Sequence, residues 1–362
     1  MHFLFGAGGT GGHLYPALAV ADALRKVNPN FRFTFTGRQD KIEGQKVPQF
    51  GYEFLPVDIG GFSLKPSIST ARSVVKLIKA RNKIVKYMKT EGCDAVIVAG
   101  AYISIPPGFA AVNMNTPLFL MESNVNPGKA ISLLTARARA VYTSFEESKN
   151  YFPRPFRKKI IYTGNPIRAD FADMPSKNDA KSRIGFEPNK PLLLIFGGSL
   201  GAASINNFVI KNIDNLQNSG FNTVWQTGAN FNILDNLPQN IKAFNYIDDM
   251  SLYYSAADLI VSRSGASTVS ELTLTGKPSV LLPLPSASNN EQFKNAEIMQ
   301  KFGASVLIND KEINSKLFNI VNTLISDNSK LESLSDKAKK LAKPGAAEQI
   351  ANRILEMIGY NG

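Results

Sequence analysis

Cysteine and histidine are scarce in this chain of 362 residues. The single cysteine, Cys93, excludes a disulfide framework and is typical of a reducing compartment, so we expect the protein in the cytoplasm. His2 and His13 are the only histidines, so a reaction that needs an imidazole has little choice of residue. No apolar run approaches the ~18 residues of a membrane-spanning helix, and the N-terminus lacks the basic segment of a signal peptide.

Motifs for metal binding and nucleotide hydrolysis are missing as well. The sequence contains no C-x-x-C, H-E-x-x-H or G-x-x-x-x-G-K-[ST], so zinc chemistry and P-loop hydrolysis lack their usual residues. It has no Asp-x-Asp pair for a metal–diphosphate complex, since Asp248 and Asp249 are adjacent. We therefore expect no metal ion and no other cofactor, and a departing diphosphate would have to be stabilised by helix N-termini.

Acidic residues are outnumbered, with 29 Asp and Glu against 41 Lys and Arg, a net charge of +12. Nucleic acid, an anionic membrane surface or phosphorylated substrates would suit this charge. The excess is uneven, because residues 65–89 contain no acid. The basic residues of this segment are Lys65, Arg72, Lys76, Lys79, Arg81, Lys83, Lys86 and Lys89.

Part of this basic segment has a helical pattern. Val74, Leu77, Ile78, Ile84, Val85 and Met88 lie near one face, and Lys76, Lys79, Lys83 and Lys86 follow another. The lysines form either a solvated face of a helix that covers a sheet, or a dock for anionic lipid head groups at ~1 kcal/mol per basic residue. In the second case the apolar stretch 103–109 could add inserted contacts.

Apolar strand-like runs alternate with helical patterns, which predicts parallel sheets covered by helices. A length of 362 residues with 44% apolar residues favours two globular domains. The predicted strands include 31–36, 95–99, 118–121, 160–162, 192–196, 223–226, 259–262 and 279–282. A turn at 163–166 marks the expected boundary, and the amphipathic final helix, 346–358, could pack back on the first domain.

Two glycine loops follow apolar strands, at 8–13 and at 197–202. Glycines before a helix let backbone N–H groups close on a phosphate at the positive end of the helix dipole. Residues 6–11 also match G-x-G-x-x-G, and Arg38 leaves an NADP site open. The second loop disfavours a dinucleotide, because a dehydrogenase would not need another anion loop in its other half.

Polar segments in the second half suit a nucleotide sugar. Residues 263–271 lead into a helix with N–H groups free for a diphosphate, and Glu271 could accept hydrogen bonds from ribose hydroxyls. Alternatively, Glu271 is a first-turn acid that pairs with the helix dipole. The amides and carboxylate of 289–295 suit sugar hydroxyls, although loop polarity alone predicts the same composition.

Together these motifs resemble those of the MurG family of N-acetylglucosaminyltransferases, in glycosyltransferase family 28. The matching segments, in order, are 8–13 with 15–17, 100–104, 163–168, 197–202, 246–250 and 263–271. The resemblance covers nearly the whole chain and implies an α/β GT-B fold, with two Rossmann-like parallel-sheet domains facing across a cleft. Residues 1–164, with helix 346–362, would bind the acceptor and the membrane, and residues 165–345 would bind UDP-GlcNAc.

The resemblance also implies the reaction and its partners. GlcNAc would pass from UDP-GlcNAc, with inversion, to the MurNAc 4-hydroxyl of undecaprenyl-pyrophosphoryl-MurNAc-pentapeptide (lipid I), making lipid II for peptidoglycan. The protein would work at the cytoplasmic face of the bacterial inner membrane, near cell-wall and division machinery and without nucleic acid. Another GT-B enzyme, such as a diacylglycerol glycosyltransferase or a UDP-GlcNAc 2-epimerase, and a non-catalytic nucleotide-sugar sensor are the alternatives.

Site residues follow from the same motifs. His13 and Glu271 would be catalytic, with His13 as general base because a helix N-terminus favours neutral imidazole; acceptor binding or a structural role is the alternative. The UDP-GlcNAc residues would be Thr10, Gly11, Gly12, Asn124, Arg168, Ser199, Ile247, Ala266, Ser267, Thr268, Val269, Ser270, Glu271, Gln292 and Asn295. Tyr102, Lys76, Lys79, Lys83 and Lys86 would serve the acceptor and the membrane.

Three positions depart from the family pattern. Met121 stands where a histidine is usual, which puts a role of this position near the acceptor in doubt. Ala101 replaces a common glycine, and Asn290 with Glu291 replaces an Asp-His or Asp-Arg-Gln run. Because His13, Glu271 and Gln292 remain, we expect an active enzyme.

Overall fold

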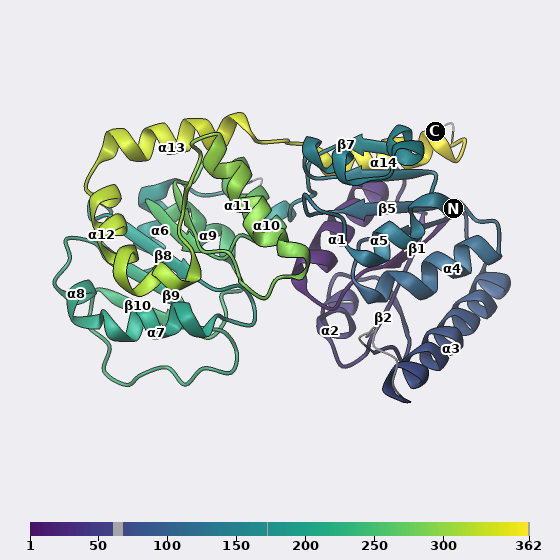
Figure 1. Cartoon of the computed structure of the whole chain (residues 1–362), viewed down its shortest axis with the longest axis horizontal. Helices are drawn as coiled ribbons and strands as arrows, with labels where there is room; N and C mark the ends of the chain where they lie inside the picture. The colour runs from purple at the N-terminus through teal and green to yellow at the C-terminus, as the bar shows by residue number, and fades with distance from the viewer. Residues whose placement is uncertain (61–67, 172, 361–362) are drawn as a thin grey trace. The chain divides into compact units, whose positions relative to one another are not determined.

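The computed structural model describes residues 1–60, 68–171 and 173–360 (Figure 1). Lys65 of the basic segment lies outside these residues, as do positions 361 and 362 of the predicted C-terminal helix. Contacts divide the chain into two compact units, Met1–Arg168 with Lys343–Gly362, and Ala169–Ala342. The predicted domain limits, 1–164 with 346–362 and 165–345, stay a prediction.

The first unit is a parallel sheet with helices on both faces. Its described strands run in the order β3-β2-β1-β4-β5-β6-β7, and every pairing is parallel. The strands are β1 (His2–Gly6), β2 (Arg32–Gly37), β3 (Glu53–Pro56), β4 (Ala95–Val98), β5 (Leu118–Glu122), β6 (Ala140–Thr143) and β7 (Ile160–Tyr162). The helices are α1 (Gly11–Val27), α2 (Ile42–Gln49), α3 (Ile68–Glu91), α4 (Ile105–Asn113), α5 (Lys129–Leu134) and α14 (Ala346–Met357), with the 3-10 turn η1 (Tyr102–Ser104).

The second unit repeats this plan. Its described strands run in the order β10-β9-β8-β11-β12-β13, again all parallel. They are β8 (Leu192–Phe196), β9 (Asn222–Gln226), β10 (Ile241–Phe244), β11 (Leu259–Ser262), β12 (Ser279–Leu281) and β13 (Val306–Leu307). The helices are α6 (Lys177–Arg183), α7 (Ala203–Lys211), α8 (Ile213–Gln217), α9 (Met250–Ala256), α10 (Ala266–Thr275), α11 (Glu291–Lys301), α12 (Ile313–Ile325) and α13 (Asn328–Lys340), with the turn η7 (Asp310–Glu312).

The inner strands are mostly apolar because helices cover both faces of each sheet. In β1 and β8 every residue is buried. Aromatic side chains fill one side of the first sheet, where the ring centres of Phe5 and Phe35 are 4.7 Å apart and those of Phe3 and Phe33 are 5.7 Å apart. The predicted α/β class with parallel sheets is confirmed, and so are all of the predicted strand segments.

Helix α14 belongs to the first unit although it ends the described chain. Ile350, Ala351 and Ile354 are buried in the core that also contains Leu14 and Leu18 of α1. The Asn28 amide donates to the Tyr360 hydroxyl over 3.1 Å, which fixes the segment after α14 as well. Helix α14, yellow in Figure 1, packs against α1 within this unit.

The basic helix α3 packs only part of its apolar residues. Ile84 and Met88 are buried, and Leu77 and Val85 pack against the same core. Val74 and Ile78 are 39% and 47% exposed, so the N-terminal part of this apolar face is open to solvent rather than packed in the core. Over the described part of the chain, no helix combines the length and the apolar character needed to cross a bilayer.

Candidate functional site

The first glycine loop, between β1 and α1, is built around a buried carboxylate. Glu43 of α2 is fully buried, and its two oxygens accept hydrogen bonds from the backbone N–H groups of Gly9 at 2.9 Å and of Arg38 at 3.0 Å. A Cβ on Gly8, which has φ +150°, would lie 2.4 Å from the Glu43 carboxyl carbon. The chain's own carboxylate thus occupies a position that the sequence alone suggested for a phosphate.

His13 lies in the first turn of α1, after Thr10, Gly11 and Gly12. Its Nδ1 is 3.1 Å from the Thr10 hydroxyl. The ring packs against Gly100, where a Cβ would come within 2.9 Å of His13 Cδ2. Burial lowers the pKa of His13 to about 4. The imidazole is therefore neutral at pH 7, the form that can accept a proton.

The loop after β5 is organised by Glu122 rather than by the residue before it. The Glu122 carboxylate accepts hydrogen bonds from the N–H groups of Asn124 at 2.9 Å and of Gly128 at 2.8 Å. Met121 is 2% exposed and packs in the apolar core with Phe119. A methionine is therefore accommodated at this position as a core residue, and Asn124 keeps a fixed, half-buried place.

Two further predicted residues lie in the first unit. Tyr102 begins the turn η1, directly after Ala101, whose φ of +55° and ψ of 175° are unusual for a residue with a side chain. The Arg168 guanidinium carbon is 5.0 Å from the centre of the Tyr15 ring, a cation–π contact. Contacts group Arg168 with the first unit, although the sequence boundary placed it in the second.

The second glycine loop, between β8 and α7, is fixed by an amide. Gln226 is 1% exposed, and its Nε2 donates to the carbonyl of Gly198 over 3.1 Å while its Oε1 accepts from the N–H of Ile247 over 2.9 Å. Gly201 has φ +75°, and a Cβ there would lie 2.1 Å from the Thr227 carbonyl oxygen. The Gln226 side chain thus bonds to two predicted parts of the donor site, Ile247 and the residue before Ser199.

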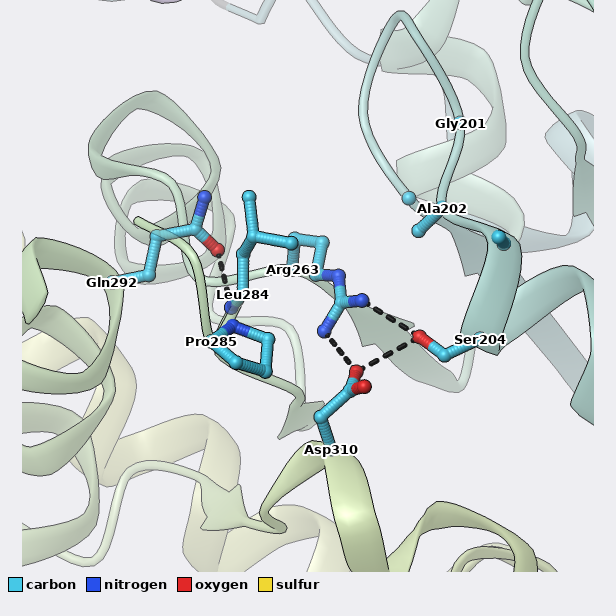
Figure 2. A pocket seen from close by; sticks show the side chains of 10 residues that line it. Gly201, Ala202, Ser204, Arg263, Leu284, Pro285, Gln292 and Asp310 are labelled. Atoms are coloured by element: carbon cyan, nitrogen blue, oxygen red, sulfur yellow. Dashed lines mark hydrogen bonds and ion pairs between the residues drawn. The ribbon is translucent and has the colours of Figure 1, made fainter. Parts of the chain in front are cut away.

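A cavity of about 460 Å³ opens beside this loop (Figure 2). It is lined by Gly197, Gly201, Ala202, Ala203, Ser204, Arg263, Leu284, Pro285, Gln292 and Asp310. Gln292, on α11, accepts a hydrogen bond from the Leu284 N–H through Oε1 at 3.0 Å, so its carboxamide is held at the rim. Among the predicted donor residues, Gln292 lines the cavity itself.

The predicted residues Ala266, Ser267, Thr268, Val269, Ser270 and Glu271 form the first turns of α10, whose N-cap is Gly265. Glu271 accepts a hydrogen bond from the Tyr254 hydroxyl at 3.0 Å, beyond the first turn, so it is not a capping-box acid. Asn295 is fully buried and donates to the Ser264 carbonyl over 3.1 Å. Asn295 therefore holds the backbone of the segment before α10 from within the protein interior.

Sequence reasoning missed the side chains that hold both loops. Glu43, Gln226, Ser204 and Asp310 lie far in sequence from the segments that they support, and only the strand order brings them there. The sequence contained one signal for these four residues, their place at or after the end of a strand. Ligands bind at the carboxyl edge of the strands in open α/β sheets.

Comparison with known proteins agrees with this architecture. Residues 3–143 match the glycosyltransferase family 28 N-terminal domain, and residues 192–350 match the glycosyltransferase family 28 C-terminal domain. A relative from Flavobacterium psychrophilum, named UDP-N-acetylglucosamine–N-acetylmuramyl-(pentapeptide) pyrophosphoryl-undecaprenol N-acetylglucosamine transferase, is 35% identical over 98% of this chain and 97% of its own.

Solved structures agree with the sequence relatives. The crystal structure of Acinetobacter baumannii MurG has a TM-score of 0.75 and 26% identity, over 98% of this chain and 99% of that one. A calicheamicin glycosyltransferase has a TM-score of 0.70 at 15% identity, over 99% and 98% of the two chains, which shows the fold alone.

The chain has two α/β units, each with a parallel sheet and with a glycine loop after β1 or β8. Together with the family matches, this architecture identifies a glycosyltransferase of the GT-B class. Within that class, the chain belongs to glycosyltransferase family 28 and there to the MurG family. The resemblance found in the sequence is thereby confirmed.

Proposed function

We propose that this enzyme transfers GlcNAc from UDP-GlcNAc, with inversion, to the MurNAc 4-hydroxyl of lipid I. The observation that carries the proposal is 35% identity, over nearly the full length of both chains, to a relative named for this transfer. A neutral histidine at the N-terminus of α1 supplies the base that the reaction needs.

The donor binds mainly to the second unit. The N-termini of α7 and α10 direct backbone N–H groups and the positive end of each helix dipole toward the diphosphate. Glu271 accepts from the ribose hydroxyls, and Gln292 at the rim of the cavity meets the hydroxyls of GlcNAc. Ser199 and Ile247 contribute through the loop that Gln226 holds.

The transfer itself is a displacement at the anomeric carbon. His13 takes the proton of the acceptor 4-hydroxyl as that oxygen forms its bond to C1 of GlcNAc, and the bond from C1 to the phosphate oxygen breaks. UDP leaves with the bonding electrons, and the helix N-termini stabilise its charge without a metal ion. Excess EDTA should therefore leave the rate unchanged.

The acceptor is lipid-linked, and we assign its docking to one side of the first unit. Val74, Val75 and Ile78 of α3, Phe109 of α4 and Leu133 of α5 are exposed apolar residues on three helices of this unit. Lys76, Lys79, Lys83 and Lys86 are exposed along α3. Within 103–109, Phe109 is exposed whereas Ile103, Pro106 and Pro107 are buried, so that stretch offers less apolar surface than its sequence suggested.

Such a surface binds the cytoplasmic face of the membrane by inserting apolar side chains and attracting anionic head groups. Reversal of Lys76, Lys79, Lys83 and Lys86 to Glu should abolish binding to anionic liposomes. Reversal of Lys211, Lys301, Lys316 and Lys340 in the second unit makes the same change of charge and should weaken binding far less. Equal losses from both variants would remove α3 as the docking element.

One assay separates the proposal from its alternatives. The purified protein is incubated with UDP-GlcNAc alone, with a lipid I analogue or with diacylglycerol, and products are followed by mass spectrometry. A disaccharide-lipid supports the transfer. Release of UDP and ManNAc without acceptor would indicate an epimerase, transfer to diacylglycerol another glycosyltransferase, and binding without turnover a sensor.

A further inference from the structure

Arg263 is a cation at the edge of the donor cavity, but its charge is already engaged. The side chain is 8% exposed and therefore buried in this unit. Nη1 donates to Asp310 Oδ1 at 2.6 Å, to the Leu282 carbonyl at 2.9 Å and to the Pro283 carbonyl at 3.1 Å. Nη2 donates to the Ser204 hydroxyl at 2.7 Å, and Nε is buried away from solvent.

Ser204 and Asp310 are hydrogen-bonded to each other as well as to the Arg263 Nη atoms, while Nε is buried without a hydrogen-bond partner among the described residues. The Ser204 hydroxyl accepts from Arg263 and donates to Asp310 Oδ1 over 2.8 Å, so the three side chains form a triangle (Figure 2). We call them the Arg263 cluster. The Asp310 carboxylate, at 2.6 Å, neutralises the guanidinium. A diphosphate in the cavity would therefore meet a paired ion rather than an available positive charge.

The cluster connects four neighbouring strands at their carboxyl ends. Arg263 follows β11, Ser204 begins α7 after β8, Leu282 follows β12, and Asp310 begins η7 after β13. These strands are adjacent in the order β8-β11-β12-β13. One side chain thus sets the distance between the N-terminus of α7 and the Leu282–Pro283 backbone that precedes cavity residues Leu284 and Pro285.

We propose that Arg263 is a positioning residue of the donor site, which holds the N-terminus of α7 against the diphosphate without contacting the diphosphate itself. The inference rests on the proposed function, since it concerns how that donor site is held. A planar fork of donors is required, because lysine has one nitrogen and cannot bond to Asp310, Ser204 and two carbonyls in this arrangement. A lysine at position 263 would keep the positive charge but lose the planar fork of donors, so we expect it not to keep the geometry of the donor site.

The test compares Arg263→Lys with Arg263→Met by calorimetric titration with UDP and with uridine. Both variants should bind UDP on the order of tenfold more weakly, while uridine affinity changes less than about twofold, since only the diphosphate depends on α7. Retention of UDP affinity in Arg263→Lys but not in Arg263→Met would overturn the proposal, because the charge itself would then bind the diphosphate. Unchanged UDP affinity in both variants would overturn it too.

Ser204→Ala keeps the inference testable if the arginine variants do not fold. It removes the link to α7 and leaves the ion pair with Asp310, and UDP binding should weaken about threefold; unchanged UDP binding would count against the proposal. Glu297→Gln, which removes the exposed pair with Lys301 at 3.4 Å, is the control and should bind UDP normally. If the wild-type protein transfers no GlcNAc to the lipid I analogue, but the variants bind UDP as expected here, the proposed function is refuted and the positioning role of Arg263 is not.

Discussion

The two glycine loops follow equivalent strands, yet they are held by opposite chemistry. β1 lies in the order β3-β2-β1-β4-β5 and β8 in the order β10-β9-β8-β11-β12. Behind the first loop, the Glu43 carboxylate accepts from backbone N–H groups. Behind the second, the Gln226 amide donates to a backbone carbonyl. The first support takes one backbone N–H of its loop, that of Gly9, whereas the second takes a backbone carbonyl and leaves the N–H groups of its loop unengaged by this side chain.

This difference separates the roles of the loops. A phosphate beside Glu43 would meet a like charge, so the first loop is suited to present a neutral imidazole instead. In the second unit, the cavity beside the loop has its basic side chain paired with Asp310, and the helix N-termini remain as the source of positive potential. Two loops in equivalent positions of similar sheets are thus held by different supporting side chains, Glu43 and Gln226.

The largest effect should come from the histidine of the first loop. His13→Ala should lower turnover by about 10²–10⁴, the usual contribution of general base catalysis, because no proton acceptor remains. UDP affinity should be nearly unchanged. Steady-state kinetics and a UDP titration measure the two quantities. Near-normal turnover would remove His13 as the base.

The same histidine predicts a pH profile. Because burial lowers the pKa of His13 from 6.5 to about 4, kcat should stay level as the pH falls through 6.5 and decline only toward pH 4. The same depressed pKa makes neutral His13 stabilise the fold above pH 6.5, a contribution lost as the pH falls toward 4. NMR titration of the His13 ring checks the midpoint, and a value near 6.5 would contradict the burial.

Replacement of the first support should impair the loop next most. In Glu43→Gln an NH₂ group must face either the Gly9 or the Arg38 N–H, so one backbone donor loses its acceptor. We expect a loss of about 1–3 kcal/mol in the free energy of unfolding and a turnover about tenfold lower. Urea unfolding and kinetics measure these, and unchanged uridine affinity is the internal control. Wild-type stability would show that the carboxylate is dispensable.

The second support gives the reciprocal experiment. Gln226→Glu keeps the acceptor for Ile247 but turns a carboxylate toward the Gly198 carbonyl. UDP affinity should fall about tenfold at pH 8 and recover on acidification, since the protonated acid can again donate. Parallel titrations of the wild-type protein provide the control. A loss that does not depend on pH would show that the Gly198 contact does not set affinity.

The smallest effect concerns Ala101, beside the glycine that packs on His13. Its φ of +55° with ψ of 175° is costly for a side chain, so Ala101→Gly should stabilise the protein by about 1 kcal/mol. Urea denaturation measures the change. A midpoint that stays the same or falls would mean that the backbone relaxes without cost.

Much of the fold could be predicted because the central strands are continuous apolar runs between helical patterns. Strands not among those predicted include β13, whose two residues are too few for a hydrophobic pattern, and β6, whose four residues are no fewer than those of β4. The pattern of α3 was misleading in another way, because an apolar face does not reveal where the core ends. Val74 and Ile78 continue the periodicity of Ile84 and Met88 into solvent.

The site could be predicted less completely, for a physical reason. His13 and Gln292 could be proposed from the sequence because they lie in local motifs that resemble those of the family, and their roles stay predictions. Glu43 holds the Gly9 N–H, 34 residues away, and Asp310 holds Arg263, 47 residues away, so these contacts exist only once the sheets are assembled. Met121 likewise lost its apparent significance once its side chain was found in the core.

Helix α14 has a consequence for the order in which the protein is made. The second unit, Ala169–Ala342, is continuous in sequence, so all of its residues are synthesised before those of α14. The first unit begins earlier but lacks Ile350, Ala351 and Ile354 of its core until the end. During synthesis, the first unit is therefore the last to complete its core. Until α14 is made, the apolar surface of α1 that it covers stays exposed.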